Sequence, residues 1–353
     1  MAAICRELPE MEIRGNTRVF GILGHPVQHS LSPLLHNMAF KSVDYPAVYI
    51  PLDVKETGPF LKRTLQNLDL GGLSVTIPHK IWAYRMADSS DPLSRICGAS
   101  NTLLFKRSGD EIQIEARNSD GPGAIQALKN ISRIQGKSVV ICGYGGSSRA
   151  IAAQLLISEK PAELWITGRN PTRIKSFIRD LKKQFPRASI QALEDGAAGL
   201  PSTEKKSGGT GQNVSARNHS LKTRIAKSSS ATGGKVTVRE SPLENLRHPD
   251  ILIQTTPLGM QSKTSGKKGN TSKAKNLPVN PDLIDINTTV FDIVYSPMET
   301  PLLSLAKKKG CKVVYGYSML LYQAVFQFRW FTGKEPPVER WEKLLRKDLK
   351  SKK

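Results

Sequence analysis

The sequence predicts an α/β protein with mainly parallel sheets and two domains. Short apolar runs typical of strands alternate along the chain with segments of helical spacing. A glycine-rich turn lies in mid-chain, near residue 143, between such a run and a helix. The 353 residues exceed the usual length of one domain and suit two.

In the first 130 residues, apolar runs that end in glycine or a polar loop predict strands. Segments in which apolar residues recur at spacings of three and four predict helices. The turn Ser108-Gly109-Asp110 joins two further strands within 96–121. In chain order we expect strand 18–24, helix 34–42, strand 47–54, helix 59–68, a strand leading through a loop into a helix over 71–80, and helix 121–130.

The alternation continues to the last helix, which Gly333 and Pro336-Pro337 end. We expect a strand, glycine turn and helix over 137–156, strand 163–170, helix 174–184, strands 250–260 and 288–297, helix 302–309, strand 311–316 and helix 318–331. The first domain then covers 1–120, completed by C-terminal helices over 318–353, and the second covers 121–317.

The formal net charge of +22 is concentrated in three segments. Residues 201–240, 261–280 and 340–353 carry +6, +5 and +5, which leaves only +6 for the rest of the chain. The stretches 201–236 and 261–280 are rich in Ser, Gly and Lys, so we expect disordered loop insertions. No aromatic residues interleave their charges, so solvated loops are favoured over a nucleic-acid or other polyanion site.

The composition argues against several other classes of protein. The four cysteines stand far apart, so neither a disulfide framework nor a metal site is expected. No run of eighteen uncharged apolar residues predicts a membrane span, and the charged first residues predict no secretory signal. We expect a cytoplasmic protein that is a monomer or homodimer.

The turn Gly143-Tyr144-Gly145-Gly146-Ser147-Ser148-Arg149 predicts a dinucleotide site of the Rossmann type. Glycines let the backbone approach a pyrophosphate, and the helix that follows offers it unpaired N–H groups. The next strand ends in Thr167-Gly168-Arg169-Asn170, with Arg173 close behind, and has no carboxylate for a ribose hydroxyl. Two guanidiniums suit a 2′-phosphate, so we predict NADP over NAD.

Polar side chains precede this turn in four short stretches. They are the hydroxyls of Ser30 and Ser32, Thr76 with Lys80, the amide of Asn101, and the carboxylate of Asp120. Ligands of open α/β sheets lie beyond the carboxyl ends of the strands, where we expect these groups to converge. The mixture suits a polyhydroxylated anionic molecule. Lys80 and Asp120 form an acid–base pair for ketone reduction, although each taken singly also fits a surface lysine or a helix cap.

Eight segments together resemble the shikimate dehydrogenase family. They are HSLSP, VTIPHK, GASNT, NSDG, GYGGSSR, TTPLGM, DIVYSPMETPLL and GYSMLLYQA, in family order, from about Arg18 to about Phe331. The resemblance implies a two-domain fold with the active site in the interdomain cleft. It also implies NADP-linked, reversible reduction of 3-dehydroshikimate to shikimate, in the pathway to chorismate and the aromatic amino acids.

The resemblance also implies roles for individual residues. The catalytic pair is Lys80 and Asp120. The substrate contacts are Ser30, Ser32, Thr76, Lys80, Asn101, Asp120, Tyr295 and Gln323. The pyrophosphate contacts are Gly143, Gly145, Gly146, Ser147 and Arg149, and those of the 2′-phosphate are Arg169, Asn170 and Arg173. Met260 and Gly316 lie near the nicotinamide, although Met260 also fits a core position, as does Gln323.

Four positions depart from the usual family pattern, namely Ser74, Tyr144, Gln254 and Ser318. Ser74 and Gln254 each stand where asparagine is usual, and Tyr144 where a small residue is common. These departures leave the choice between shikimate and quinate open. A broader quinate/shikimate dehydrogenase and a non-catalytic polyanion-binding relative are the alternative hypotheses.

Overall fold

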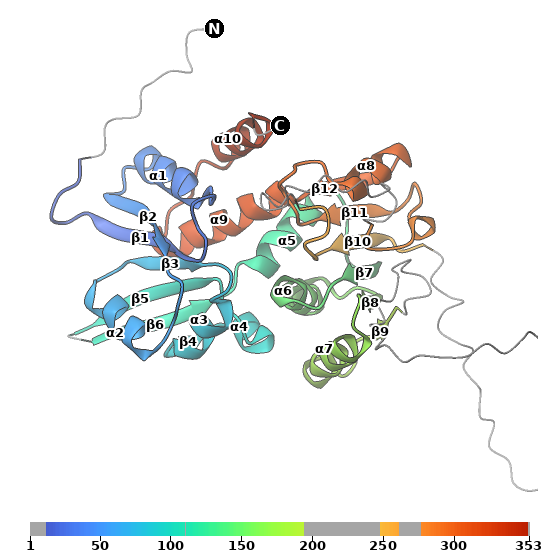
Figure 1. The fold of residues 1–353 in the computed structure, drawn as a ribbon, viewed down its shortest axis with the longest axis horizontal. Helices are drawn as coiled ribbons and strands as arrows, with labels where there is room; N and C mark the ends of the chain where they lie inside the picture. The colour runs from blue at the N-terminus through green and yellow to red at the C-terminus, as the bar shows by residue number, and fades with distance from the viewer. Residues whose placement is uncertain (1–11, 110, 194–247, 261–276, 352–353) are drawn as a thin grey trace, which may run out of the picture. The chain divides into compact units, whose positions relative to one another are not determined.

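The computed structural model describes residues 12–109, 111–193, 248–260 and 277–351. These residues contain two six-stranded sheets (Figure 1) with the orders β2-β1-β3-β5-β6-β4 and β12-β11-β10-β7-β8-β9. Contacts among the described residues place both sheets in one compact unit. The domain boundaries expected from the sequence stay a prediction.

The first sheet and its helices occupy the N-terminal third of the chain. Their bounds are β1 Arg18–Gly24, α1 Ser32–Ser42, β2 Ala47–Asp53, α2 Pro59–Asn67, β3 Gly72–Val75, α3 Lys80–Met86, β4 Ser89–Ser90, α4 Pro92–Cys97, β5 Thr102–Ser108 and β6 Glu111–Arg117. Strand β5 is antiparallel to both β3 and β6. The sequence did not predict α4, whose start Asp91 caps by accepting a bond from the Ser94 backbone N–H at 2.7 Å.

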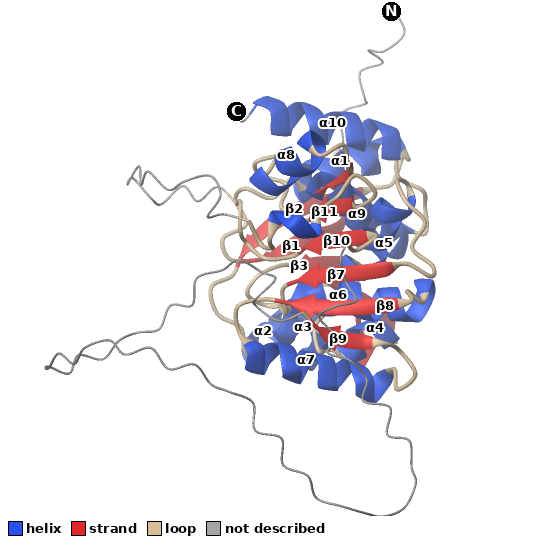
Figure 2. Cartoon of the chain, turned by 90° about the vertical axis from the view of Figure 1, so that its right-hand side faces the viewer, coloured by secondary structure: helices blue, strands red, loops and turns tan. Residues whose placement is uncertain are grey.

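The second sheet is wholly parallel. Figure 2 shows β7, β8 and β9 side by side, with α7 beside β9. The elements are α5 Asp120–Lys129, β7 Ser138–Cys142, α6 Gly146–Gln154, a π-helical turn Leu155–Glu159, β8 Glu163–Thr167, α7 Pro171–Gln184, β9 Ile190–Ala192, β10 Ile251–Gln254, a 3₁₀ turn Pro281–Leu283, β11 Thr289–Asp292, α8 Pro301–Lys308, β12 Lys312–Tyr315, α9 Gly316–Thr332 and α10 Val338–Ser351. The expected strands are runs of buried aliphatic residues, as parallel sheets require.

The prediction of a disordered insertion over 261–280 is wrong for its last four residues. Residues 277–280 belong to the packed structure, with Val279 2% exposed and the Asn280 side chain accepting a bond from the Asp282 backbone N–H at 3.0 Å. Pro278 and Val279 are apolar, unlike the lysines and serines before them, and this difference marks where the composition returns to that of a core. The insertion predicted over 201–236 and residues 261–276 lie outside the described residues.

Two glycines let helix α5 pack closely on its neighbours. A Cβ atom at Gly123 would lie 2.9 Å from the Gln323 backbone nitrogen of α9, and one at Gly121 would lie 2.7 Å from the Ala150 carbonyl oxygen of α6. Only a residue without a side chain permits approaches this short. Because Asp120 begins α5, this packing fixes the position of that carboxylate relative to α9.

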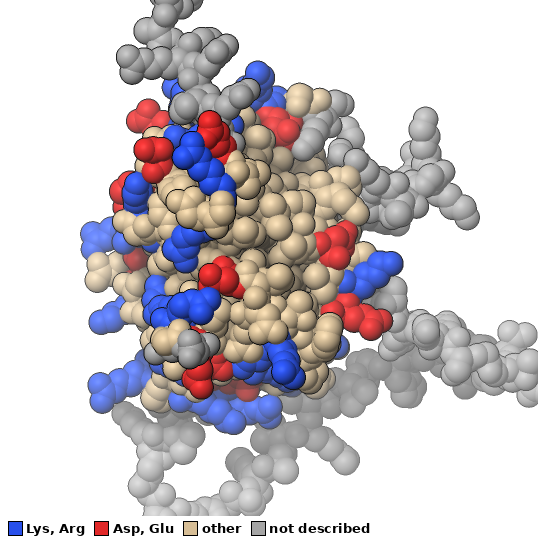
Figure 3. Space-filling model, turned by 90° about the vertical axis from the view of Figure 1, so that its left-hand side faces the viewer, with Lys and Arg blue, Asp and Glu red and all other residues tan. Residues whose placement is uncertain are grey.

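Charges are mixed on the surface of the described residues. Figure 3 shows lysine and arginine interspersed with aspartate and glutamate on one face. Ion pairs such as Arg107 with Asp69, at 2.8 Å, contribute to this pattern. No helix within the described ranges is both long and apolar enough to cross a lipid bilayer.

Candidate active site

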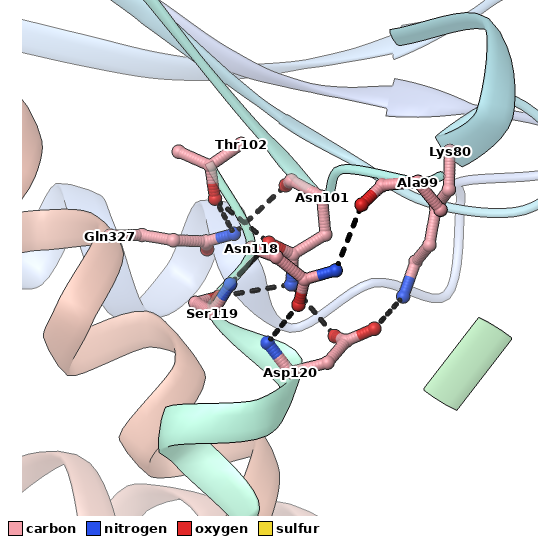
Figure 4. A network of polar contacts seen from close by, with 8 residues as sticks. All are labelled: Lys80, Ala99, Asn101, Thr102, Asn118, Ser119, Asp120 and Gln327. Carbon is pink, nitrogen blue, oxygen red and sulfur yellow. Dashed lines mark hydrogen bonds and ion pairs between the residues drawn. The ribbon is translucent and has the colours of Figure 1, made fainter. Parts of the chain in front are cut away.

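Lys80 and Asp120 form an ion pair at the starts of two helices. Lys80 is the first residue of α3 and Asp120 the first of α5, and Lys80 Nζ lies 2.5 Å from Asp120 Oδ2 (Figure 4). The Lys80 side chain is 22% exposed, whereas that of Asp120 is 2% exposed. Lys80, which solvent can reach, is thus held in place by Asp120, which solvent hardly reaches. This arrangement is suited to proton transfer.

Asn101 orients this carboxylate. Its Nδ2 donates to Asp120 Oδ1 at 2.7 Å, while its Oδ1 accepts from the Ser119 backbone N–H at 2.8 Å and from Thr102 Oγ1 at 3.0 Å. Asn118 Oδ1 accepts from the Asp120 backbone N–H at 2.9 Å. Both carboxylate oxygens of Asp120 therefore accept hydrogen bonds from the protein. These bonds replace hydration by water and stabilise the ionised form.

Strand direction explains why these residues meet. Ser74, near the carboxyl end of β3, pairs with Thr102 at the start of antiparallel β5, and Thr102 pairs with Arg117 at the end of β6. Asn101 therefore reaches the same sheet edge as Thr76 although it precedes a strand rather than following one. Convergence was expected from the carboxyl ends of strands alone, and Asn101 arrives there by the opposite route.

A cavity of about 240 Å³ lies against this edge. Seven of the eight residues predicted to contact the substrate line it, namely Ser30, Ser32, Thr76, Lys80, Asn101, Tyr295 and Gln323. The eighth, Asp120, lines an adjoining cavity of about 550 Å³ together with Lys80. The lining is rich in hydroxyl and amide groups, which suit a small ligand with several oxygens.

Gln327 is a lining residue that the sequence analysis missed. It lies on α9, one turn beyond Gln323, and is 6% exposed. Its amide bridges Ser74 on β3 and Thr102 on β5, at 2.8 and 3.0 Å. Two glutamines four residues apart in an otherwise apolar helix were the signal in the sequence, because that spacing places both on one face.

The loop that carries Tyr295 is held by Asp292 at the end of β11. Asp292 Oδ1 accepts from the Val294 backbone N–H at 3.0 Å, and Oδ2 accepts from Thr300 Oγ1 at 2.7 Å. Burial raises the pKa of Asp292 to about 6, because the ionised carboxyl loses its hydration there.

Burial likewise raises the pKa of the Cys97 thiol to about 12, so this neighbour of Asp120 is no nucleophile at neutral pH.

The residues predicted to hold the cofactor are distributed over two cavities. Ser147, Met260 and Gly316 line the 550 Å³ cavity, next to Lys80. Gly143, Gly145 and Arg169 line a third cavity of about 200 Å³. Residues 255–257 line both, so the two cavities share a wall.

The glycine turn fits a phosphate group closely. Gly143 has φ +125°, and a Cβ atom there would lie 2.4 Å from Thr255 Oγ1. Gly145 is the N-cap of α6 and offers no side chain to the first backbone N–H groups of that helix. A Cβ atom at Gly143 would thus meet the protein itself, whereas one at Gly145 or Gly146 would meet nothing within 4 Å, so these two glycines leave room beside the first N–H groups of α6 that fits the pyrophosphate of a dinucleotide.

Four predicted cofactor residues line none of these three cavities. Gly146 opens α6, and Asn170 caps α7 by accepting a bond from the Arg173 backbone N–H at 3.0 Å. The Arg173 guanidinium lies 5.9 Å from the centre of the Tyr144 ring. Arg149 points to α7, where it pairs with Asp180 at 3.2 Å and lies over the Phe177 ring. Arg149 is therefore bound to α7 and not to the glycine turn. Arg173, by contrast, lies over Tyr144, which lines the third cavity.

Within the described parts of the chain, no group of three or more His, Cys, Asp or Glu residues is placed to bind a metal ion.

Two family models match the chain. The shikimate dehydrogenase substrate-binding domain matches residues 22–103, and the shikimate 5′-dehydrogenase C-terminal domain matches residues 316–346. The shikimate dehydrogenase (NADP⁺) of Methanobrevibacter smithii is 34% identical over 340 residues, which are 96% of this chain and 99% of that protein.

Solved structures agree with this result. A crystal structure of a shikimate dehydrogenase in complex with NADP⁺ has a TM-score of 0.71 and 26% identity, and the match covers 96% of this chain and 98% of the other. The Thermus thermophilus shikimate 5-dehydrogenase, in complex with NADP(H) and shikimate, has a TM-score of 0.65 and 25% identity, with coverage of 94% and 99%.

Proposed function

This chain belongs to the shikimate dehydrogenase family, and we propose that it catalyses the reversible reduction of 3-dehydroshikimate to shikimate. It is an NADP-dependent oxidoreductase of the shikimate pathway. The observation that supports the proposed chemistry best is the Lys80–Asp120 pair, which lies where the hydroxyl-lined cavity meets the larger one. A cytoplasmic location and a monomeric or homodimeric state stay predictions.

The proposed mechanism divides the work between the two cavities. NADPH, when bound along the glycine turn, supplies the hydride for the substrate carbonyl carbon. Lys80 Nζ donates a proton to the carbonyl oxygen as negative charge develops there, and Asp120 keeps the ammonium aimed at that oxygen. In the oxidation direction the same pair accepts the proton of the substrate hydroxyl.

The remaining residues of the smaller cavity bind and orient the substrate. Ser30, Ser32 and Thr76 offer hydroxyl groups to the carboxylate and hydroxyls of the substrate, and Tyr295 and Gln323 complete the wall. Such positioning reduces the entropy that is lost on reaching the transition state.

A spectrophotometric assay of the purified full chain tests this function. We expect NADP⁺ reduction with shikimate, and faster turnover with shikimate than with quinate at saturation. Turnover with quinate alone would instead assign a quinate dehydrogenase, and no turnover with either would contradict the proposal.

Arg169 is expected to select NADP over NAD. It lines the third cavity beside Gly168, is exposed, and has no ion-pair partner among the described residues, so its guanidinium can meet a 2′-phosphate. Hydrogen bonds to charged groups contribute about 1.5–3 kcal/mol, so Arg169→Ala should raise the KM for NADP⁺ by roughly 10–100-fold. The KM for NAD⁺, which lacks this phosphate, should change little.

The control is Arg179→Ala, an exposed arginine on α7 whose side chain bonds Ser176 at 3.2 Å. Steady-state kinetics with both nucleotides measure the effect. Equal increases of both KM values in Arg169→Ala would contradict the assignment, since they would indicate general damage to the nucleotide site.

A further inference from the structure

Gln327 connects the last long helix to the start of β5. Its Nε2 donates to the Asn101 carbonyl oxygen at 3.1 Å and to Thr102 Oγ1 at 3.0 Å. Its Oε1 accepts from Ser74 Oγ at 2.8 Å. The amide thus uses both of its hydrogens, in a buried position where lost bonds have no replacement from water.

These bonds reach the catalytic carboxylate through Asn101. A threonine hydroxyl has a single hydrogen, and Thr102 gives it to Asn101 Oδ1 at 3.0 Å while Gln327 donates to the Thr102 oxygen. With Oδ1 held as an acceptor, the Asn101 nitrogen must face Asp120, to which it donates at 2.7 Å. Figure 4 shows this path from Gln327 to Asp120, which does not pass through Lys80.

The main chain of Asn101 is fixed by the same amide. The Asn101 carbonyl oxygen accepts both from the Val75 backbone N–H of β3, at 2.7 Å, and from Gln327. Helix α9 is thereby bonded to two strands at the point where they present Thr76 and Asn101 to the cavity.

We propose that Gln327 is a positioning residue for the dehydrogenase reaction, which fixes the orientation of Asn101 and, through it, that of Asp120. This inference rests on the proposed function. The Ser119 backbone N–H also bonds Asn101 Oδ1, at 2.8 Å, and supports the same orientation. The loss of Gln327 should therefore weaken the alignment of the carboxylate without abolishing it.

Position 74 is coupled to position 327. Ser74 stands where the family pattern usually has asparagine, and its Oγ already touches Gln327. An asparagine at 74 would extend further toward the Gln327 amide than the serine does, so we expect the two long side chains to compete for this space.

The test compares Gln327→Leu with the wild type in the assay with shikimate. We expect kcat to fall roughly 10–100-fold, with an unchanged KM for NADP⁺ and an altered pH profile of kcat. The matched control is Gln66→Leu, which removes an amide bond to the Ile112 carbonyl oxygen, 3.0 Å long, and lies outside the three cavities. Wild-type kcat and pH profile in Gln327→Leu, with only a lower melting temperature, would overturn the proposal.

Three further variants keep the test decisive if Gln327→Leu does not fold. Gln327→Glu retains an acceptor for Ser74, but its ionised form cannot donate to Thr102. The ionisable groups near this path are Asp120, Lys80 and, beside Ser74, Tyr49, and both proteins share all three. The kcat of this variant relative to the wild type should therefore rise as the pH falls and the new carboxyl is protonated.

The exchange variant tests the coupling itself. Ser74→Asn alone should lower kcat, and Ser74→Asn combined with Gln327→Ala should recover at least part of it. Additive losses in the double variant would contradict the inference. Because the wild type is assayed alongside, its failure to turn over shikimate would overturn the proposed function and this inference together, whereas unaffected variants would overturn the inference alone.

Discussion

Replacing Lys80 with alanine is expected to lower the turnover of shikimate by about 10²–10⁴-fold, the usual contribution of a positioned proton donor. The variant loses the ammonium that lies 2.5 Å from Asp120 at the wall of both cavities. Binding of NADP⁺ should be retained, because the ion pair of Lys80 is with Asp120 and Arg169 lines a different cavity. Initial rates at saturating substrate, together with calorimetric titration of NADP⁺, measure the two effects separately.

Lys62→Ala is the matched control. Lys62 Nζ lies 2.7 Å from Asp88 Oδ1, so this variant also breaks a lysine–aspartate pair, but one that is about a third exposed and distant from the substrate cavity. Exposed pairs of this kind contribute little to stability. We expect wild-type turnover from it. Similar losses in both variants would indicate general destabilisation, and full turnover by Lys80→Ala would remove Lys80 from the mechanism.

The sequence predicted which residues lie together at the site, because the signals for this are local. An apolar run followed by a polar loop and a helix start shows where a strand ends, and strands that run in the same direction end at the same edge of a sheet. For this reason Thr76, Lys80 and Asp120 lie close together. The two strands predicted within 96–121 correspond to β5 and β6, whose antiparallel pairing carries Asn101 to the same edge.

What the sequence could not give depends on partners distant in the chain. Arg149 was expected to bind the pyrophosphate, yet Asp180, 31 residues later, pairs with it. No local pattern predicts such a pair. Gln327 likewise bonds Ser74 across 253 residues. The short elements β4 and β9 have only two and three residues, too few to show a periodicity.

His36 leads to the second large prediction, a loss of stability in acid that depends on one side chain. It lies on the buried face of α1 with Leu35, Ala39 and Phe40 and is fully buried. Its ring stacks on Tyr49 at 4.4 Å between centres, and Phe328, Phe331 and Trp341 surround it. Neither ring nitrogen has a hydrogen-bond partner among the residues that the structure describes.

Burial lowers the pKa of His36 from 6.5 to about 3, because no group replaces the hydration of the imidazolium ion. Tyr49 is the titratable member of the surrounding rings, and burial raises its pKa, so it stays neutral in acid. Between pH 6.5 and about 3 the unfolded chain binds a proton at His36 that the folded protein does not. The stability due to neutral His36 is therefore fully present above pH 6.5 and is lost as the pH falls through this window.

His36→Leu should remove this part of the pH dependence, because leucine fills a similar volume and does not titrate. One pKa unit corresponds to about 1.4 kcal/mol, so at pH 5 the variant should gain about 2 kcal/mol relative to the wild type beyond any difference at pH 7.5. Urea unfolding at both pH values measures the gain, and all other groups cancel in the comparison. Phe40→Leu, at a buried ring of the same cluster that does not titrate, is the control, and its difference from the wild type should be the same at both pH values. If the wild type and His36→Leu lose stability in parallel from pH 7.5 to 5, His36 must bind its proton in the folded protein, and the aromatic cluster must open to water to allow it.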